Sequence, residues 1–249
     1  MTESSMQNIT EDTLTDAVLA TIDNKSDPRF REIMISLIRH LHGFAREVNL
    51  TKEEWLAAIE FLYQTGEKTT HKRNEFILLS DTLGLSSLVD MISSRGDDEA
   101  TEVSVLGPFY IDGAPMLKNG ADLIGDNAGE PGIVRGRILS ADGKPIVGAM
   151  LDIWQNASNG MYSNEDPEQD DFNLRGRLIA ADDGSYSFTT TRPMPYTVPE
   201  DGPAGVMLEA MGRHPWRPAH IHFKVSAEGY QDLITEIYPD DDEYIDSDA

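Results

Sequence analysis

The chain has 249 residues and a formal net charge of −24, and both quantities limit what it does. Its length is enough for one large or two small domains with a buried core. The negative charge argues against nucleic-acid binding, which needs a basic face. Because the sequence contains no cysteine, disulfides, cysteine-ligated zinc and thiol catalysis are excluded, and any metal must be held by His, Asp, Glu, Tyr or backbone.

The sequence gives no indication of a membrane span or a secretion signal. No apolar stretch approaches the ~20 residues that a membrane helix needs. Residues 1–5 lack the basic start and the apolar core of a signal peptide. We therefore expect a soluble, cytoplasmic protein. The acidic run at residues 240–243 is predicted to be a solvated loop, with calcium binding as the alternative.

The first third of the chain is predicted to be helical. Asp27 and Pro28 supply an N-cap and a first-turn proline, and Thr51 with Glu54 forms a capping box for the next helix. Further helical segments are expected at residues 73–83 and 86–91, separated by Gly84. The first helix carries one apolar stripe, made of Ile33, Leu37, Leu41, Phe44 and Val48. These helices carry more apolar residues than a small bundle needs, which indicates packing on a partner or on the rest of the chain.

The composition changes at about residue 95, where a linker-like stretch occupies residues 93–98. We expect a helical domain over residues 1–95 and a strand-rich domain over residues 96–249. Asp142-Gly143 and Asp183-Gly184 predict two hairpins by their turn chemistry. Short strands without intervening helices indicate an antiparallel β-sandwich, so the fold class is mainly β with an N-terminal α-helical domain. The expected strands are residues 133–139, 146–154, 174–180, 185–190, 220–225 and 233–238.

His220 and His222 are the first candidates for a metal site. Residues two apart on a strand point to the same face, and imidazole suits zinc, copper and iron. A solvated pair of histidines is the alternative. Tyr162 and Tyr196 lie in two irregular segments, residues 156–172 and 193–208, whose composition favours loops over packed core; long loops in compact domains are often functional.

A tyrosine binds metal as phenolate, although its ordinary pKa is about 10. It therefore needs a strongly Lewis-acidic ion, and ferric iron fits this better than zinc or ferrous iron. A ferrous oxygenase would instead show two histidines and one carboxylate. The residues alone leave open whether the two tyrosines are ligands or structural groups.

Five ordered motifs resemble those of the intradiol ring-cleaving dioxygenases, non-haem ferric enzymes that act on catechols and hydroxyquinol. The motifs are Leu106-Gly107-Pro108-Phe109-Tyr110, Gly160-Met161-Tyr162-Ser163, Phe172-Asn173-Leu174-Arg175-Gly176, residues 195–203 and residues 217–223. The resemblance covers nearly the whole chain. It implies a homodimer through the N-terminal helices, a phospholipid-like amphiphile at the dimer contact, and a β-sandwich that holds non-haem Fe(III).

The resemblance also implies roles for particular residues. Tyr162 and His220 match equatorial iron ligands, and Tyr196 and His222 match the axial pair. Arg217 matches an arginine beside the bound substrate, where it stabilises developing negative charge. Tyr196, once displaced by the diol, is expected to accept a substrate proton. The substrate-binding residues implied are Leu78, Asp81, Gly107, Pro108, Val198 and Arg217.

The resemblance is greatest to the hydroxyquinol 1,2-dioxygenase branch. Asp81 is placed to accept a hydrogen bond from a third hydroxyl, which predicts a preference for hydroxyquinol over catechol. A helix cap or surface carboxylate is the alternative for Asp81. Two departures stand out: family members usually continue beyond residue 249, so the sequence reads as a C-terminally truncated form, and Glu236 stands where catechol enzymes often carry glutamine, with no role assigned.

Other classes of function compete with this interpretation. Within enzymes, a catechol or chlorocatechol 1,2-dioxygenase shares parts of the same motifs, and an extradiol enzyme would use ferrous iron with a carboxylate ligand. Residues 136–149 also resemble the opening of non-catalytic β-sandwich binding modules, for which the two tyrosines and the His-x-His pair would not be expected together.

Overall fold

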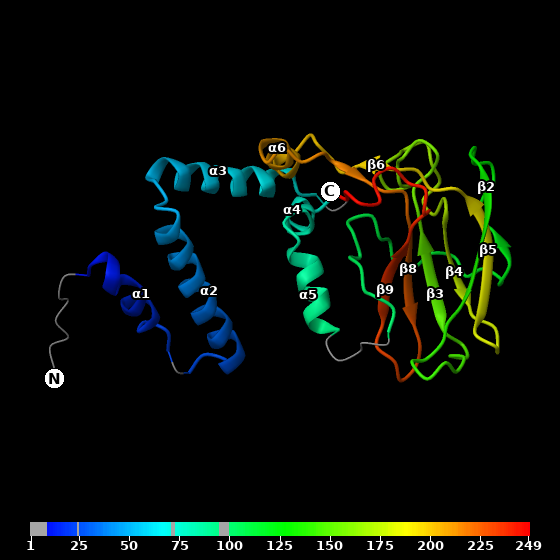
Figure 1. Cartoon of the computed structure of the whole chain (residues 1–249), viewed down its shortest axis with the longest axis horizontal. Helices are drawn as coiled ribbons and strands as arrows, with labels where there is room; N and C mark the ends of the chain where they lie inside the picture. The colour runs from blue at the N-terminus through cyan, green and yellow to red at the C-terminus, as the bar shows by residue number, and fades with distance from the viewer. Residues whose placement is uncertain (1–8, 24, 71–72, 95–99) are drawn as a thin grey trace. The chain divides into compact units, whose positions relative to one another are not determined.

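The computed structural model describes residues 9–23, 25–70, 73–94 and 100–249, and the chain forms two compact units, Met1–Phe61 and Leu62–Ala249. The first unit contains α1 (Glu11–Leu19), α2 (Pro28–Glu47) and the start of α3 (Lys52–Lys68) (Figure 1). Helix α1 packs against α2, where Arg46 donates a hydrogen bond to the backbone oxygen of Glu11 at 2.7 Å.

Both predicted helix starts of this unit are confirmed. The Asp27 carboxylate accepts the backbone N–H of Phe30 at 2.8 Å, as an N-cap does. Thr51 and Glu54 form the capping box, with reciprocal distances of 2.8 and 3.2 Å. The apolar stripe of α2 is about half exposed along its whole length.

The second unit is built around a β-sandwich. One sheet has the order β4-β3-β8-β9, with every neighbouring pair antiparallel. The other has the order β1-β5-β2, in which β2 and β5 are antiparallel and β1 runs parallel to β5. A short antiparallel pair, β6 with β7, lies outside both sheets. The bounds are β1 Ala121–Asp122, β2 Pro131–Arg137, β3 Met150–Trp154, β4 Arg175–Ile179, β5 Ser185–Thr191, β6 Tyr196–Thr197, β7 Trp216–Arg217, β8 Ile221–Ser226 and β9 Leu233–Ile237.

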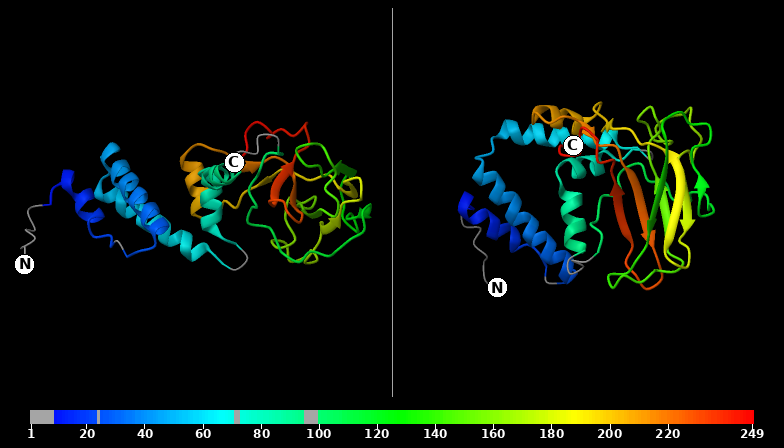
Figure 2. Two further views of the ribbon diagram at one scale, coloured as in Figure 1. Left: turned by 90° about the horizontal axis from the view of Figure 1, so that it is seen from below. Right: turned by 45° about the vertical axis from the view of Figure 1, so that its right-hand side comes forward.

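The core of the sandwich lies between the two sheets, which face each other (Figure 2). Leu151 and Ile153 from β3 and Phe223 from β8 meet Phe188 from β5, and all are almost completely buried. Burial of each such side chain contributes roughly 1.5–3 kcal/mol of transfer free energy. The fold class expected from the sequence is confirmed.

The two predicted hairpins are wrong in their pairing, although both turns form. At the first turn, Ile146 donates to the Ile138 oxygen at 3.0 Å, but β2 then pairs with β5 and β3 pairs with β4 and β8. At the second turn β4 and β5 likewise separate into different sheets. An Asp-Gly turn specifies local geometry only, whereas the choice of sheet depends on which faces become buried far along the chain.

Three helices accompany the sandwich in the second unit. The helices α4 (Glu75–Thr82) and α5 (Leu85–Ser93) are separated at Gly84, whose φ of +71° suits glycine. Helix α6 (Pro203–Ala210) was not predicted, because residues 193–208 were expected to be irregular. It packs on α4, with the Ala204 N–H donating to the buried Glu75 carboxylate at 3.2 Å.

Within the described ranges, no single helix combines the length and the apolar composition that crossing a membrane requires. The bent pair α4 and α5, which meet at 78°, passes that test when the two are joined, by length and composition alone.

We predict that Gly205→Ala destabilises the second unit. An ideal Cβ at Gly205 would lie 2.4 Å from the Cα and 2.6 Å from the oxygen of Glu200, so α6 would have to move off the preceding backbone. Overpacking of this kind costs about 1–3 kcal/mol. Urea unfolding curves would measure the change.

Gly66→Ala in α3 is the matched control, since its Cβ would meet its nearest neighbour at 4.0 Å. We expect this substitution to leave stability unchanged or raise it by up to about 1 kcal/mol through helix propensity. Equal unfolding midpoints for the two variants would contradict the packing argument.

Candidate functional site

His220 and His222 lie at the start of β8, and each is about 1% exposed. Their Nε2 atoms are 3.1 Å apart, so the two rings converge as expected for a His-x-His strand. The Nδ1–H of His220 donates to the Pro218 backbone oxygen at 2.8 Å, and His222 stacks on Trp154 with ring centroids 4.6 Å apart. The alternative of a solvated histidine pair is therefore wrong.

Tyr162 and Tyr196 are brought to the same place from two different segments. Their side chains are buried, at 0% and 6% exposure, although Tyr162 lies in an irregular segment and Tyr196 in the two-residue β6. The Tyr162 hydroxyl is 3.3 Å from Nε2 of His220, and the two tyrosine rings meet edge-on at 5.5 Å. Phe109 stacks on Tyr162 at 4.6 Å. The expectation of a loop holds for residues 156–172 but is wrong for part of residues 193–208, which contain β6 and the start of α6, and the two tyrosines form a small aromatic core.

All four side chains are expected to be uncharged without a bound cation. Burial raises the pKa of Tyr162 well above its ordinary value, and the neighbouring Tyr196 adds to this. Burial also raises the pKa of Tyr196, against an opposing effect of Arg217. Burial lowers the pKa of His220 and, further, of His222. Neutral imidazoles are the metal-binding form, whereas the phenols need a strong cation to lose their protons.

The donor set fits a strongly Lewis-acidic ion. Two imidazole nitrogens and two phenol oxygens converge from β8 and two separate segments, inside a buried aromatic shell. A second grouping is also present: His220, His222 and Glu236 offer ligand atoms within 4.8 Å of one another. A two-histidine, one-carboxylate set is typical of ferrous oxygenases, so the position of Glu236 bears on which metal ion the cluster suits.

Glu236 lies opposite His222 in the register of β8 with β9 and its side chain is fully buried. Its Oε1 is 3.1 Å from Nδ1 of His222 and 3.9 Å from Nε2 of His220. Its Oε2 accepts from Arg217 at 3.2 Å and from the Tyr238 hydroxyl. Sequence reasoning gave Glu236 no role, and the signal that was available was an acidic residue inside the predicted strand at residues 233–238.

Arg217 connects several of these groups. Its side chain is 13% exposed and holds the Asp248 carboxylate with two contacts of 2.9 Å. Its Nη1 is 3.4 Å from Nε2 of His220. A surface ion pair would leave the guanidinium in solvent, whereas this arginine is largely buried at the edge of the donor cluster.

A cavity of about 250 Å³ opens beside this cluster. Its lining includes Tyr196 and Arg217 together with four residues expected to bind substrate, namely Leu78, Asp81, Pro108 and Val198. Gly107 instead lies against His222, where an ideal Cβ would be 3.5 Å from Cε1. Burial raises the pKa of Asp81, while a hydrogen bond with Ser86 lowers it. Five of the six expected substrate-binding positions thus line this cavity, and Gly107 does not.

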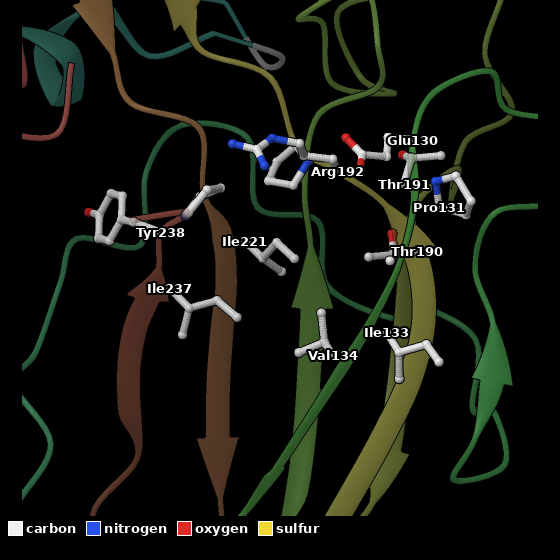
Figure 3. Close-up of a pocket in the computed structure, with 13 residues that line it drawn as sticks. Glu130, Pro131, Ile133, Val134, Thr190, Thr191, Arg192, Ile221, Ile237 and Tyr238 are labelled. Atoms are coloured by element: carbon white, nitrogen blue, oxygen red, sulfur yellow. The ribbon is translucent and has the colours of Figure 1, made fainter. Parts of the chain in front are cut away.

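Figure 3 shows another cavity, of about 260 Å³, between β2 and β5 on one side and β8 and β9 on the other. Ile133, Val134, Ile221 and Ile237 line it, with Glu130 and Arg192 at one end. These four lining residues are aliphatic, whereas Tyr196, Arg217 and Asp81 line the cavity described above.

The second unit is a β-sandwich with a buried cluster of two histidines and two tyrosines, and comparisons with known proteins identify its class. Residues 105–249 match the family model described as "Dioxygenase", and residues 27–101 match "Catechol dioxygenase N terminus". The chain belongs to the intradiol dioxygenase family. It is an enzyme of that class.

Individual relatives are similar over most of their length. The chain is 44% identical to 6-chlorohydroxyquinol 1,2-dioxygenase of Cupriavidus pinatubonensis, over 98% of the chain and 88% of that protein. It is 46% identical to hydroxyquinol 1,2-dioxygenase of a Rhizobium species, over 96% and 81%. The crystal structure of hydroxyquinol 1,2-dioxygenase from Pseudomonas putida DLL-E4 matches with a TM-score of 0.89 at 49% identity, over 96% of this chain and 83% of that one. Catechol 1,2-dioxygenase of Acinetobacter radioresistens matches with a TM-score of 0.84 at 29% identity, over 97% and 80%.

The acidic run at residues 240–243 is not uniform. Asp240, Asp241 and Glu243 are exposed, as expected, but Asp242 is 9% exposed. Its carboxylate accepts the Ala219 N–H at 3.1 Å and the Tyr244 N–H at 2.9 Å. Asp242 therefore fixes the backbone directly before His220.

We predict that Asp242→Ala destabilises the second unit by about 1–3 kcal/mol, because it leaves the buried Ala219 N–H without its acceptor. Denaturant unfolding would measure the loss. Asp241→Ala is the control: this exposed carboxylate pairs with Arg192 at the surface, where ion pairs contribute little, so no measurable change is expected. A destabilised Asp241 variant with an intact Asp242 variant would contradict this assignment.

Proposed function

We propose that the chain cleaves hydroxyquinol (1,2,4-trihydroxybenzene) with dioxygen between its two adjacent hydroxylated carbons, at a non-haem Fe(III) centre. The product is the ring-opened hydroxymuconate, the tautomer of maleylacetate. One observation carries the proposal: the four predicted ligands converge beside a cavity that is lined by both Arg217 and Asp81.

Tyr162, Tyr196, His220 and His222 are the residues proposed to hold the iron. Their chemistry supports the ferric state, because a buried phenol of raised pKa becomes a ligand only against a strong positive charge. When bound, the ferric ion supplies a Lewis acid that draws charge from the diol and favours reaction of the ring with dioxygen.

The protein residues then have separable tasks. Tyr196 belongs both to the ligand cluster and to the cavity wall, so its phenolate is placed to accept a proton from an entering diol. Arg217 lies on the same wall and stays cationic, so it stabilises negative charge that develops on the substrate. Leu78, Pro108 and Val198 supply apolar surface that holds the ring and excludes water.

Asp81 supports hydroxyquinol over catechol as the substrate. Its half-buried side chain lines the cavity from α4, beside Leu78 and Thr82. A carboxylate that accepts a hydrogen bond from a third hydroxyl discriminates against the analogue without that hydroxyl. The names of the curated relatives, two of which act on hydroxyquinols, point the same way, whereas a catechol or chlorocatechol preference is the competing outcome.

A visible absorption spectrum with iron analysis would test the metal proposal first. The iron-loaded protein is expected to show a broad tyrosinate-to-iron band, which shifts when hydroxyquinol is added without oxygen. Tyr162→Phe should weaken the band because it removes one phenolate ligand. A protein that stays colourless after iron loading would contradict the ferric tyrosinate centre and favour a binding module or a ferrous site.

We predict that Asp81→Ala lowers the ratio of kcat/KM for hydroxyquinol over catechol by about 10- to 100-fold. This corresponds to the loss of one hydrogen bond to a charged group, roughly 1.5–3 kcal/mol. Steady-state oxygen uptake with each substrate would measure the ratio. Asp90→Ala, which removes a carboxylate from the neighbouring helix α5, is the control and should leave the ratio unchanged; an unchanged ratio in both variants would show that Asp81 is not the selector.

Several expectations about organisation stay predictions. The half-exposed stripe of α2, together with the exposed Trp55, Leu56 and Ile59 of α3, supports a homodimer through the N-terminal helices with a phospholipid at its contact. The domain boundary at residue 95 and the cytoplasmic location also stay predictions.

A further inference from the structure

Glu236 is a buried carboxylate whose two oxygens face different parts of the site. Oε1 lies 3.1 Å from Nδ1 of His222. Both atoms are buried and neither has a hydrogen-bond partner in the described chain, so this contact, although not aligned as a hydrogen bond, is the one open to both. Oε2 accepts from Nη2 of Arg217 at 3.2 Å and from the Tyr238 hydroxyl.

We propose that Glu236 is a positioning residue that orients His222 through Nδ1 and Arg217 through Nη2. The proposal rests on the ferric centre proposed above. Through these two contacts one carboxylate holds both His222, a proposed iron ligand, and Arg217, a cation on the cavity wall. Because Nδ1 is the ring nitrogen of His222 that lies beside Glu236, Nε2 is left as the ligand atom, and Nε2 is the atom that faces His220. A carboxylate behind a ligating histidine fixes its tautomer and raises its basicity.

The geometry argues against Glu236 as a ligand in its own right. Its closest approach to the cluster is to Nδ1 of His222, whereas Oε1 is 3.9 Å from Nε2 of His220. The Tyr162 hydroxyl and Nε2 of His222 both approach that same His220 nitrogen, at 3.3 and 3.1 Å. Arg217 and Tyr238 occupy Oε2, so only Oε1 faces the histidines.

The register of the sheet makes this arrangement specific. Glu236 and His222 are direct partners across β8 and β9, so their side chains share one face at close range. Arg217 precedes β8 and approaches from the β6–β7 pair. A shift by one residue in β9 would turn the carboxylate to the opposite face and remove both contacts.

The test compares Glu236→Gln with Asp248→Asn in the iron-loaded 249-residue protein. Glutamine keeps the shape of Glu236 but loses its charge, so the variant is expected to bind iron about 10- to 100-fold more weakly in a chelator competition. Its tyrosinate-to-iron band should also shift. Asp248 contacts Arg217 from the other side, so Asp248→Asn disturbs the arginine and keeps the Glu236 carboxylate beside His222. This variant is expected to lose less iron affinity than Glu236→Gln, and an equal loss in both would overturn the role of the His222 contact.

The outcomes separate this inference from the ferric centre itself. A wild-type protein without the band would overturn both. A wild-type protein with the band and a Glu236→Gln variant of equal iron affinity and equal band position would overturn the positioning role alone. A thermal melt establishes that each variant is folded; if Glu236→Gln does not fold, Glu236→Asp keeps the charge but shortens the reach, and wild-type iron affinity in that variant would overturn the role.

Discussion

The site depends on the burial of β8 between β3 and β9. This strand is an interior member of its sheet, and its pairing with both neighbours fixes the face to which His220 and His222 point. Trp154, opposite His222 in the register with β3, stacks on that ring at 4.6 Å with an interplanar angle of 7°. Glu236, opposite the same histidine in β9, holds it from the other side. The orientation of one ligand is thus set by two strands distant in sequence.

The four side chains proposed as iron ligands are buried and, without a metal, uncharged. The residues around them must therefore hold them in place by packing. Desolvation disfavours charged forms of both phenols and imidazoles, so a bound cation must offset that cost through direct coordination. The rings are held meanwhile by aromatic packing, with Phe109 against Tyr162 and Tyr196. Such a shell keeps donors in place at little cost, because stacked rings have few rotamers to lose.

The sequence predicted most helices and singled out four side chains that the structure brings together, but it did not predict the way the strands pair. Helix starts were predictable because caps and first-turn prolines act within four residues. The two Asp-Gly turns formed, yet their strands separated into different sheets, since sheet membership is decided by contacts that no local signal encodes. Helix α6 was missed because Pro203 and Gly205 read as loop residues, although proline suits a first helical turn and Gly205 permits close packing on Glu200. No signal in the sequence predicted the proposed role of Glu236, because that role depends on the register between β8 and β9, which local signals do not encode.

The metal donors and the proposed specificity residue lie on different layers of the second unit. The donors come from β8, β6 and the segment around Tyr162, whereas Leu78 and Asp81 come from α4. Helix α4 is joined to α6 through Glu75 and the cluster of Leu78, Val198, Ala204 and Leu208, so its position is set by packing that leaves the donor residues untouched. Substitutions on α4 can therefore alter which aromatic substrate is accepted without moving a proposed iron ligand. This separation is consistent with one fold serving solved relatives named for hydroxyquinol and for catechol, at TM-scores of 0.89 and 0.84. Arg217 is the exception, because it contacts the donor cluster, the cavity and Glu236. A change in the way substrate binds to Arg217 is therefore expected to alter the proposed metal site.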